Sequence, residues 1–394
     1  MTLFAEKTTR FLKLGQNVVF LQHPFQIKKK ETSQTMKIIT AIDSFKGSLT
    51  SAEANSAAVR AILRLNSNSN VKNILVSDGG EGWLEACSQI FEGKKMEVPV
   101  ADPLGRQVCA SYLLSGDLAV LEVAQACGLN RLSVHERNPL LADSRGVGQM
   151  ILHALKQGAR RFVVGLGGSA TCDAGYGMLQ VLADALVPSA GIMTLSSIRN
   201  LSFIIASDVQ NPLLGDMGAT RVFAPQKGAT PQMVEELEQR ISCFVQQASA
   251  AMGYDCSQKV GAGAAGGLGY AFMQFLHATY VSGADWLLER AGLDQELQCA
   301  SLVLTGEGAA DAQTLMGKLP FCVMQRAKER KVPALLFAGK VQHRTQLLQA
   351  GFSDVLCINP SEEDVSISCC PELASARLEE TVFEYLSVCP FWLG

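Results

Sequence analysis

Acidic side chains stand in short glycine-bearing loops at four places along this 394-residue chain. Each place follows a predicted strand by one to seven residues, and the set comprises Asp43; Asp78 with Glu81; Asp173; and Glu307 with Asp311. Carboxylates at such positions can surround a metal ion or a polar substrate. Any one of them could instead cap a helix, since acidic residues are favoured in first turns. For the set as a whole, the pattern favours a functional site.

Two glycine-rich segments could offer backbone N–H groups to phosphates. Gly261–Gly266 fits the G-x-G-x-x-G pattern of dinucleotide-binding proteins, but Asp255–Lys259 before it is not a buried strand. A nicotinamide-dependent hydroxy-acid dehydrogenase is therefore the less favoured alternative. Gly167–Thr171 misses the G-x-S-x-G pattern of serine hydrolases at its last position. Gly317–Lys318 is not a Walker A motif, because the rest of that pattern is missing.

Composition narrows the kinds of partner. The chain carries 34 Lys and Arg against 37 Asp and Glu, a net charge of −3, which gives no basic field for nucleic acid or for an anionic membrane. Its 12 cysteines include no C-x-x-C pair, which argues against a zinc or redox motif and favours a reducing cytoplasm. The sequence thus predicts a small-molecule site in a cytoplasmic protein.

The acidic loops lie between strands and helices that alternate. Lys37–Ile42 predicts a strand, and Thr50 with Glu53 forms a T-x-x-E capping box that opens a helix through Leu65. Further strands are predicted at Asn73–Val76, Phe162–Leu166, Leu201–Ala206, Leu302–Leu304 and Ala334–Phe337, and further helices at Trp83–Phe91, up to Leu186 and near Pro320–Arg330. This alternation predicts an α/β fold with a parallel sheet. Such sheets bind ligands beyond the carboxyl ends of their strands.

Two stretches depart from that alternation. Met96–Leu132 contains alternating short strands and a Pro-Leu-Gly turn, which predicts a second, mixed subdomain. Residues 1–35 are basic, and their apolar run Val18–Leu21 is too short for an export signal or a membrane span. We interpret 1–35 as an extension outside the fold, with Met36 as an alternative start. An organellar transit peptide is the less favoured interpretation.

Eight motifs, in the same order along the chain, resemble those of the type-1 glycerate kinases. They are Asp-Ser-Phe-Lys-Gly-Ser-Leu-Thr (43–50), Asp-Gly-Gly-Glu-Gly (78–82), Pro-Leu-Gly (103–105), Gly-Gly-Ser-Ala-Thr-x-Asp (167–173), Asp-Val-x-Asn-Pro-Leu (208–213), Pro-Gln-Lys-Gly-Ala (225–229), Gly-Ala-Gly-Ala-Ala-Gly-Gly-Leu-Gly (261–269) and Thr-Gly-Glu-Gly (305–308). One such string would be weak evidence, whereas eight in sequence are specific. The resemblance runs from Met36 to about Gly339.

The resemblance implies an ATP- and Mg²⁺-dependent transfer of the γ-phosphoryl group to D-glycerate, usually to its 2-hydroxyl. It implies two α/β domains around a cleft: a flavodoxin-like parallel-sheet domain from residues 36–92 and 296–394, and an inserted α/β domain from 93–295. The active site would lie between them. Phosphorylation of the 3-hydroxyl stays an alternative, and a homodimer is left open.

The resemblance also implies roles for single residues. Phosphoryl transfer needs a carboxylate to orient and deprotonate the hydroxyl, cations, and a positioned metal ion. Catalytic roles fall to Asp208, Lys46 and Asp43, substrate binding to Ser44, Asp78, Glu81, Arg145, Asn211 and Lys227, nucleotide binding to Gly167, Gly168, Ser169, Ala170, Thr171, Gly263, Gly266 and Gly267, and metal binding to Asp173, Glu307 and Asp311. For Asp208 a turn-stabilising role before Asn211-Pro212 carries equal weight.

Three positions depart from the family pattern. This chain has Cys172, Trp83 and Ala309 where the family carries Asn, Thr and Arg. The last departure matters most, because an Arg would offer carboxylate or phosphate a planar, charged donor pair that Ala309 lacks. A family member that binds glycerate without efficient turnover is therefore a further alternative to the active kinase that we favour.

Overall fold

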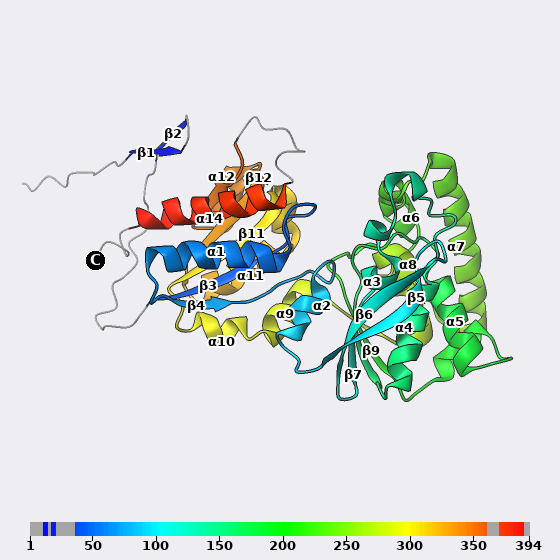
Figure 1. The fold of residues 1–394 in the computed structure, drawn as a ribbon. Coiled ribbons are helices and arrows are strands. Elements are labelled where there is room, and N and C mark those ends of the chain that lie inside the picture. Colours follow the sequence, from blue (N-terminus) through cyan, green and yellow to red (C-terminus); the bar gives the residue numbers. More distant parts are fainter. Residues whose placement is uncertain (1–10, 15–16, 21–35, 361–369, 390–394) are drawn as a thin grey trace, which may run out of the picture.

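The computed structural model describes residues 11–14, 17–20, 36–360 and 370–389. The predicted extension lies outside these ranges, apart from β1 (Phe11–Leu14) and β2 (Asn17–Phe20), which form an antiparallel pair of their own. The other described strands form two larger sheets with helices packed around them (Figure 1). The α/β fold class is confirmed.

A five-stranded parallel sheet takes its strands from both ends of the chain. Its order is β13 (Asp354–Cys357), β12 (Ala334–Val341), β11 (Leu302–Ala310), β3 (Lys37–Ile42) and β4 (Asn70–Asn73). Helices α1 (Ser51–Leu65) and α14 (Pro371–Ser387) lie side by side on this sheet (Figure 1). Helices α11 (Leu319–Glu329) and α12 (Arg344–Ala350) pack against the opposite face of the sheet.

Both faces of this sheet are buried, as strand β3 shows. Ile38 and Ile42 pack in the cluster beneath α1 and α14, whereas Ile39 and Ala41 pack in the cluster that contains α11. Successive side chains of a strand point to opposite faces, so a strand covered on both sides is apolar throughout. The strand consists of apolar residues because β3 lies inside the sheet, with helices covering both of its faces.

A six-stranded mixed sheet is built from the middle of the chain. Its order is β10 (Thr279–Val281), β9 (Ser202–Ala206), β8 (Arg161–Gly165), β7 (Leu118–Glu122), β6 (Gln107–Ser115) and β5 (Lys94–Ala101). Strands β5, β6 and β7 pair antiparallel, and β7 to β10 pair parallel. Around it lie α3 (Ala124–Cys127), α4 (Arg145–Lys156), α5 (Tyr176–Leu186), α6 (Ala219–Phe223), α7 (Pro231–Met252) and α8 (Ala264–Leu276).

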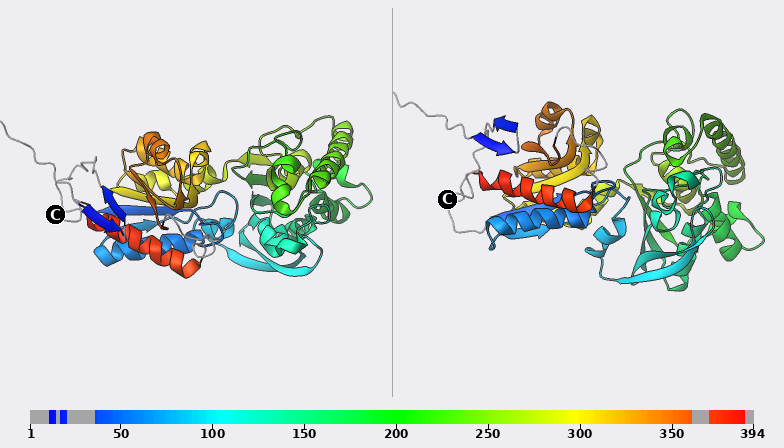
Figure 2. Two further views of the ribbon diagram at one scale, coloured as in Figure 1. Left: turned by 90° about the horizontal axis from the view of Figure 1, so that it is seen from above. Right: turned by 45° about the horizontal axis from the view of Figure 1, so that its top comes forward.

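Helices α2 (Trp83–Ser88) and α9 (Gly283–Arg290) lie between the two sheets (Figures 1 and 2). The rings of Trp83 and Trp286 have centroids 5.5 Å apart, in a hydrophobic cluster that takes residues from both sheets. The predicted boundary between residues 295 and 296 falls inside a helix, α10 (Leu293–Leu297). The proposed division into domains stays a prediction.

The capping box that predicted the first helix is confirmed. The Thr50 hydroxyl oxygen accepts a hydrogen bond from the Glu53 backbone N–H at 3.2 Å, and the Glu53 carboxylate accepts one from the Thr50 N–H at 2.9 Å. These reciprocal bonds satisfy two backbone donors at the start of the helix, which is why α1 begins at Ser51.

Other element boundaries differ from the prediction. The strand expected at Asn73–Val76 ends at Asn73, and the helix expected to reach Phe91 ends at Ser88. Strand β11 continues to Ala310 instead of ending at Leu304, because β12 pairs with it along that whole length. Among the described residues, no helix is both long and apolar enough to cross a membrane.

Candidate active site

Four acidic side chains from the two sheets are linked by the effects of their charges on one another. Asp43 follows β3, Asp78 lies in the loop after β4, and Asp208 follows β9. Glu307 lies inside β11, which corrects the prediction that it stands in a loop after a strand. The charges of Asp78 and Glu307 both raise the pKa of Asp43, and the charge of Asp78 also raises that of Asp208. Carboxylates from both sheets thus share one electrostatic site.

Close backbone contacts hold the loops of the two sheets together. The Gly167 N–H donates to the Gly79 carbonyl at 2.9 Å, and a Cβ added at Gly167 would overlap the Gly80 backbone. A Cβ at Gly283, at the start of α9, would overlap the carbonyl of Asp78. Only residues without side chains permit this approach. These glycines therefore set how near Asp78 comes to Asp208.

Asp208 has one engaged and one unengaged carboxylate oxygen. Its Oδ1 accepts from the Ser282 hydroxyl at 2.9 Å and from the Ala284 N–H at 3.4 Å, while Oδ2 is buried and has no partner among the described residues. Burial, and then the charge of Asp78, raises the pKa of Asp208 to about 6. A carboxylate with a free acceptor atom and a pKa near neutrality suits a general base. The turn-stabilising interpretation is not supported, since both bonds go to α9 and its cap.

Asp43 begins the loop that also carries Ser44 and Lys46. Burial raises the pKa of Asp43 well above its ordinary value, the nearby acids add to this, and the Ser44 N–H, 2.7 Å from Oδ1, opposes it. Ser44 is buried, whereas the Lys46 side chain is exposed and its charge also lowers the pKa of Asp43. Gly308 packs directly against the backbone of Lys46. The predicted residues of this loop do reach the acidic site.

Glu307 and Asp311 have different surroundings. Glu307 is buried and accepts from the Thr314 hydroxyl at 2.6 Å and from the Lys318 ammonium at 3.3 Å. Burial raises the pKa of Glu307. Asp311 instead accepts from the Gln313 N–H at 2.7 Å and caps the short helix η5 (Ala312–Met316). Asp311 is therefore a helix-capping residue, the alternative that the sequence left open for each of the acids.

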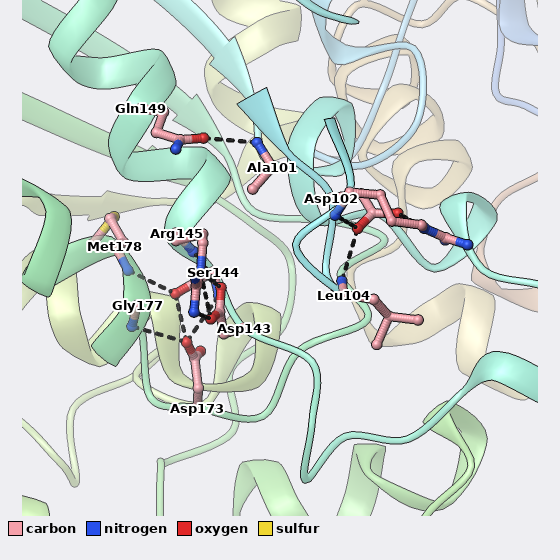
Figure 3. Close-up of polar contacts among 11 residues, drawn as sticks. Ala101, Asp102, Leu104, Asp143, Ser144, Arg145, Gln149, Asp173, Gly177 and Met178 are labelled. Carbon is pink, nitrogen blue, oxygen red and sulfur yellow. Dashed lines mark hydrogen bonds and ion pairs between the residues drawn. The ribbon is translucent and has the colours of Figure 1, made fainter. Parts of the chain in front are cut away.

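The carboxylate of Asp173 accepts hydrogen bonds from residues at the starts of helices α4 and α5 (Figure 3). Its Oδ2 accepts from the Ser144 N–H at 2.9 Å, the Ser144 hydroxyl at 2.7 Å and the Gly177 N–H at 3.1 Å, and Oδ1 accepts from the Gly175 N–H at 3.1 Å. Within the described ranges, no three His, Cys, Asp or Glu side chains are grouped to hold a metal ion. The predicted metal set of Asp173, Glu307 and Asp311 is not brought together.

Three further residues predicted to bind the substrate, Arg145, Glu81 and Asn211, are exposed or already bonded within the protein. Arg145, drawn beside Asp173 in Figure 3, is exposed and forms an ion pair with Asp143 at 2.5 Å. Glu81 is exposed on the loop that carries Asp78. The Asn211 amide donates to the Met217 carbonyl at 2.8 Å. Arg145 therefore already has a carboxylate partner, contrary to its expected role as a free cation.

Lys227 is a buried cation beside the glycine loop 167–171. Its ammonium donates to the Ser169 hydroxyl at 3.0 Å and to the Thr171 carbonyl at 2.8 Å. Only 4% of the residue is exposed, and neither of these acceptors is a carboxylate. Part of the expected donor set is used within the protein, because the Gly167 and Ala170 N–H groups donate to the carbonyls of Gly79 and Cys127. The loop keeps a cation whose charge a ligand anion could balance.

The second glycine segment serves packing. Gly263, Gly266 and Gly267 are buried, and a Cβ on them would overlap the Pro212 carbonyl, the Thr171 carbonyl and the Ala174 backbone. These glycines let α8 lie against the back of loop 167–171. Residues 253–260, directly before Gly261, form turns and irregular structure and no strand. The dinucleotide-binding pattern therefore lacks the strand that it requires.

Sequence reasoning missed the contacts that hold the carboxylates of Asp208 and Glu307. Ser282 and Tyr280, which contact the Asp208 turn, were not singled out, nor was the bond from Thr314 to Glu307. Ser282 could have been found as the N-cap of α9, since its hydroxyl accepts from the Asp285 N–H. Nothing in the local sequence marks Tyr280.

Comparison with known proteins identifies the family. The family model described as the glycerate kinase family matches residues 38–387. The chain belongs to the glycerate kinase family. A glycerate kinase of Bacillus subtilis is 40% identical over 82% of this chain and 91% of its own length. A glycerate 2-kinase of Escherichia coli is 37% identical over 78% of this chain and 86% of its own length.

A solved structure agrees with that assignment. The crystal structure of a glycerate kinase 2 from Salmonella typhimurium LT2 superposes with a TM-score of 0.73 at 32% identity, over 90% of this chain and 98% of the other. The present chain is thus a kinase, a transferase that uses a nucleotide, and its family supports glycerate as the group that is phosphorylated.

The three positions predicted to depart from the family pattern have different surroundings. Trp83 is fully buried and fills the junction between the two sheets, and Cys172 is buried near Lys227. Ala309 is exposed on β11 and pairs in register with Lys340 of β12. Lys340 is therefore the cation opposite Ala309 on the neighbouring strand, and Lys318 lies against Glu307, two residues before Ala309.

Proposed function

We propose that this kinase transfers the γ-phosphoryl group of ATP to the 2-hydroxyl of D-glycerate, with Asp208 as the general base. The observation that carries the proposal is the buried Oδ2 of Asp208, which has no partner among the described residues. An acceptor atom left open in a buried site costs stability unless a ligand uses it. Asp78, whose charge raises the pKa of Asp208, is also a predicted site residue.

Asp208 would act on the hydroxyl that attacks phosphorus. The oxygen of the glycerate hydroxyl forms a bond to the γ-phosphorus, and Oδ2 of Asp208 accepts the proton of that hydroxyl. The bond from the γ-phosphorus to the oxygen that bridges it to the β-phosphate breaks, and ADP leaves. The proton remains on Asp208 until solvent removes it. Because the pKa of Asp208 is about 6, the group is ionised at neutral pH and still basic enough to accept a proton.

Two lysines, one from each sheet's loops, would bind the charged parts of the substrates. Lys227 and the loop that contains Ser169 are proposed for the phosphates, because this buried ammonium faces no carboxylate in the contacts described above. Lys46 is proposed for the glycerate carboxylate, with Ser44, Asn211 and the acids Asp78 and Glu81 nearby as polar contacts for its hydroxyls.

The residues present fit a magnesium ion that arrives with the nucleotide. Mg²⁺ is usually held by one or two carboxylates together with substrate phosphates, and not by a complete protein cage. Asp43 and Asp78 would hold it, since burial and then the charge of Asp78 raise the pKa of Asp43, and a cation would offset both effects. When bound, the ion supplies positive charge against the transferring group.

A cytoplasmic location belongs to the same proposal. The eleven described cysteines are all free thiols, as expected in a reducing compartment.

One coupled experiment tests the reaction class, the acceptor and the position. ADP release is followed with D-glycerate, L-glycerate and hydroxypyruvate, and the product is assigned by phosphorus NMR. We expect ADP release with D-glycerate and a 2-phosphate product. A 3-phosphate product would overturn the position, and calorimetric glycerate binding without ADP release would identify a weakened family member. An absorbance change with NAD and glycerate, without ATP consumption, would favour the dehydrogenase.

A further inference from the structure

We propose that Tyr280 and Ser282 are positioning residues that fix the Asp208 carboxylate, one through the backbone and the other through the side chain. The inference rests on the proposed role of Asp208 as the base. Both residues lie where β10 passes into α9, and β10 pairs in parallel with β9, the strand that leads into Asp208. The base and its supports therefore come from neighbouring strands.

Tyr280 holds the backbone on both sides of Asp208. Its hydroxyl lies 2.7 Å from the Ser207 carbonyl oxygen and 3.2 Å from that of Val209. The ring fills the space above Gly261, where any Cβ would overlap it. Packing thus fixes the ring, and the hydroxyl ties the two carbonyls that flank the base.

Ser282 holds the side chain of Asp208. Its hydroxyl donates to Oδ1 at 2.9 Å and its oxygen accepts from the Asp285 N–H at 3.2 Å, which places it as the N-cap of α9. The carboxylate cannot rotate without breaking the bond at Oδ1. Oδ2 therefore remains the open acceptor, in a direction set by the helix that Ser282 begins.

The charged and titratable groups around Asp208 make the role of Ser282 measurable. Burial and then the charge of Asp78, from the loop after β4, raise the pKa of Asp208. Burial is also the main cause of the raised pKa of Cys322 in α11 and of Tyr280 in β10, and the charge of Asp208 adds to both. The Ser282 hydroxyl and the first N–H groups of α9 act in the opposite direction. Loss of that hydroxyl should therefore raise the pKa of Asp208 above about 6.

Tyr280→Phe tests the backbone support. The change keeps the ring beside Gly261 and removes only the hydroxyl, so we expect kcat to fall about tenfold with KM for glycerate and ATP within about twofold, since small misplacement of a reacting group is costly. Tyr254→Phe is the matched control, because the Tyr254 hydroxyl also donates to a carbonyl, that of Gln274 at 2.5 Å. An equal kcat for both variants would overturn the role of Tyr280.

Ser282→Ala tests the side-chain support through the pH profile. We expect the acid limb of kcat/KM to move upward by about half a pH unit, and Ser282→Thr to restore it because the hydroxyl returns. Thr230→Ala is the control for a lost cap, since Thr230 caps α7 through the Met233 N–H. An unmoved limb in Ser282→Ala, or an equal movement in Thr230→Ala, would overturn the role of Ser282.

Asp208→Asn, measured in parallel, separates this inference from the proposed function. If Asp208→Asn keeps its kcat, Asp208 is not the base and the positioning proposal fails with it. If Asp208→Asn loses kcat while both positioning variants behave like their controls, Asp208 stands as the base and only the positioning proposal is overturned.

Discussion

Asp208 and Asp173 both follow parallel strands of the six-stranded sheet, and burial raises the pKa of both. They differ in how their oxygens are used. Ser144 and Gly177 donate to Oδ2 of Asp173 (Figure 3), and the Gly175 N–H donates to Oδ1, so both oxygens are engaged. Asp208 leaves Oδ2 buried and unpartnered within the described structure. Two buried carboxylates that both follow strands of one sheet thus differ in whether an oxygen is left without a partner.

The bonds of Asp173 assign it a structural role, whereas the unpartnered oxygen of Asp208 supports its proposed role as the base. Asp173 joins the start of α4 to the start of α5, because Ser144 and Gly177 stand at those helix beginnings. A fully satisfied buried carboxylate stabilises the fold and has no oxygen free for a substrate proton. The open oxygen of Asp208 is costly in the fold and useful only with a ligand.

The largest expected effect is on turnover in Asp208→Asn. The amide keeps the shape of the side chain but cannot take the hydroxyl proton, so kcat should fall by at least about a hundredfold with little change in nucleotide affinity. Steady-state kinetics and nucleotide titration measure the two quantities. A kcat close to that of the unmodified enzyme would remove Asp208 from the reaction.

Asp173→Ala should lower stability where Asp208→Asn does not. The change leaves the N–H groups of Ser144, Gly175 and Gly177 without their acceptor, and we expect the free energy of unfolding to fall by about 2 kcal/mol. Urea denaturation monitored by circular dichroism measures it. The comparison breaks if Asp173→Ala is as stable as the unmodified chain but loses activity, since Asp173 would then have a role at the substrate.

The same contrast applies to the cations Lys227 and Arg145. Lys227 is buried without a carboxylate among its described bonds, whereas Arg145 is paired with Asp143. Lys227→Met should therefore raise KM for ATP about tenfold, the scale of one charge-assisted bond. Arg145→Met should change it less. A larger rise for Arg145→Met in steady-state kinetics would restore Arg145 to the substrate site.

The smallest effect is a pH-dependent gain of stability in Asp208→Asn. The folded-state pKa of Asp208, about 6, exceeds the ordinary value near 3.9, so the fold disfavours the ionised form. The stability contribution of Asp208 is therefore greatest below about pH 4 and is lost as pH rises to about 6. Asparagine avoids that loss, whose upper limit from the pKa difference is about 3 kcal/mol, and we expect a gain of at least about 1 kcal/mol at pH 8 and none near pH 4. Denaturant melts at both pH values measure the difference, and equal stability at pH 8 would contradict it.

Local patterns predicted much of the fold. The capping box at Thr50 placed the start of α1, and the apolar run at Lys37–Ile42 placed β3, because caps and strand burial depend on nearby residues. Strand ends were less predictable. The extension of β11 past Leu304 depends on pairing with β12, some 30 residues further along the chain.

The sequence by itself determined the family, the order of strands and glycine loops, and the candidate set of acids and cations, since these are written in motifs and spacing. Only the tertiary structure decided which members of that set are free to react. The bond from Ser282 to Asp208 joins residues 74 apart, and that from Lys227 to Ser169 joins residues 58 apart. Whether a buried oxygen or ammonium is hydrogen-bonded depends on such contacts between residues distant in the chain, and these contacts cannot be predicted from a local sequence pattern.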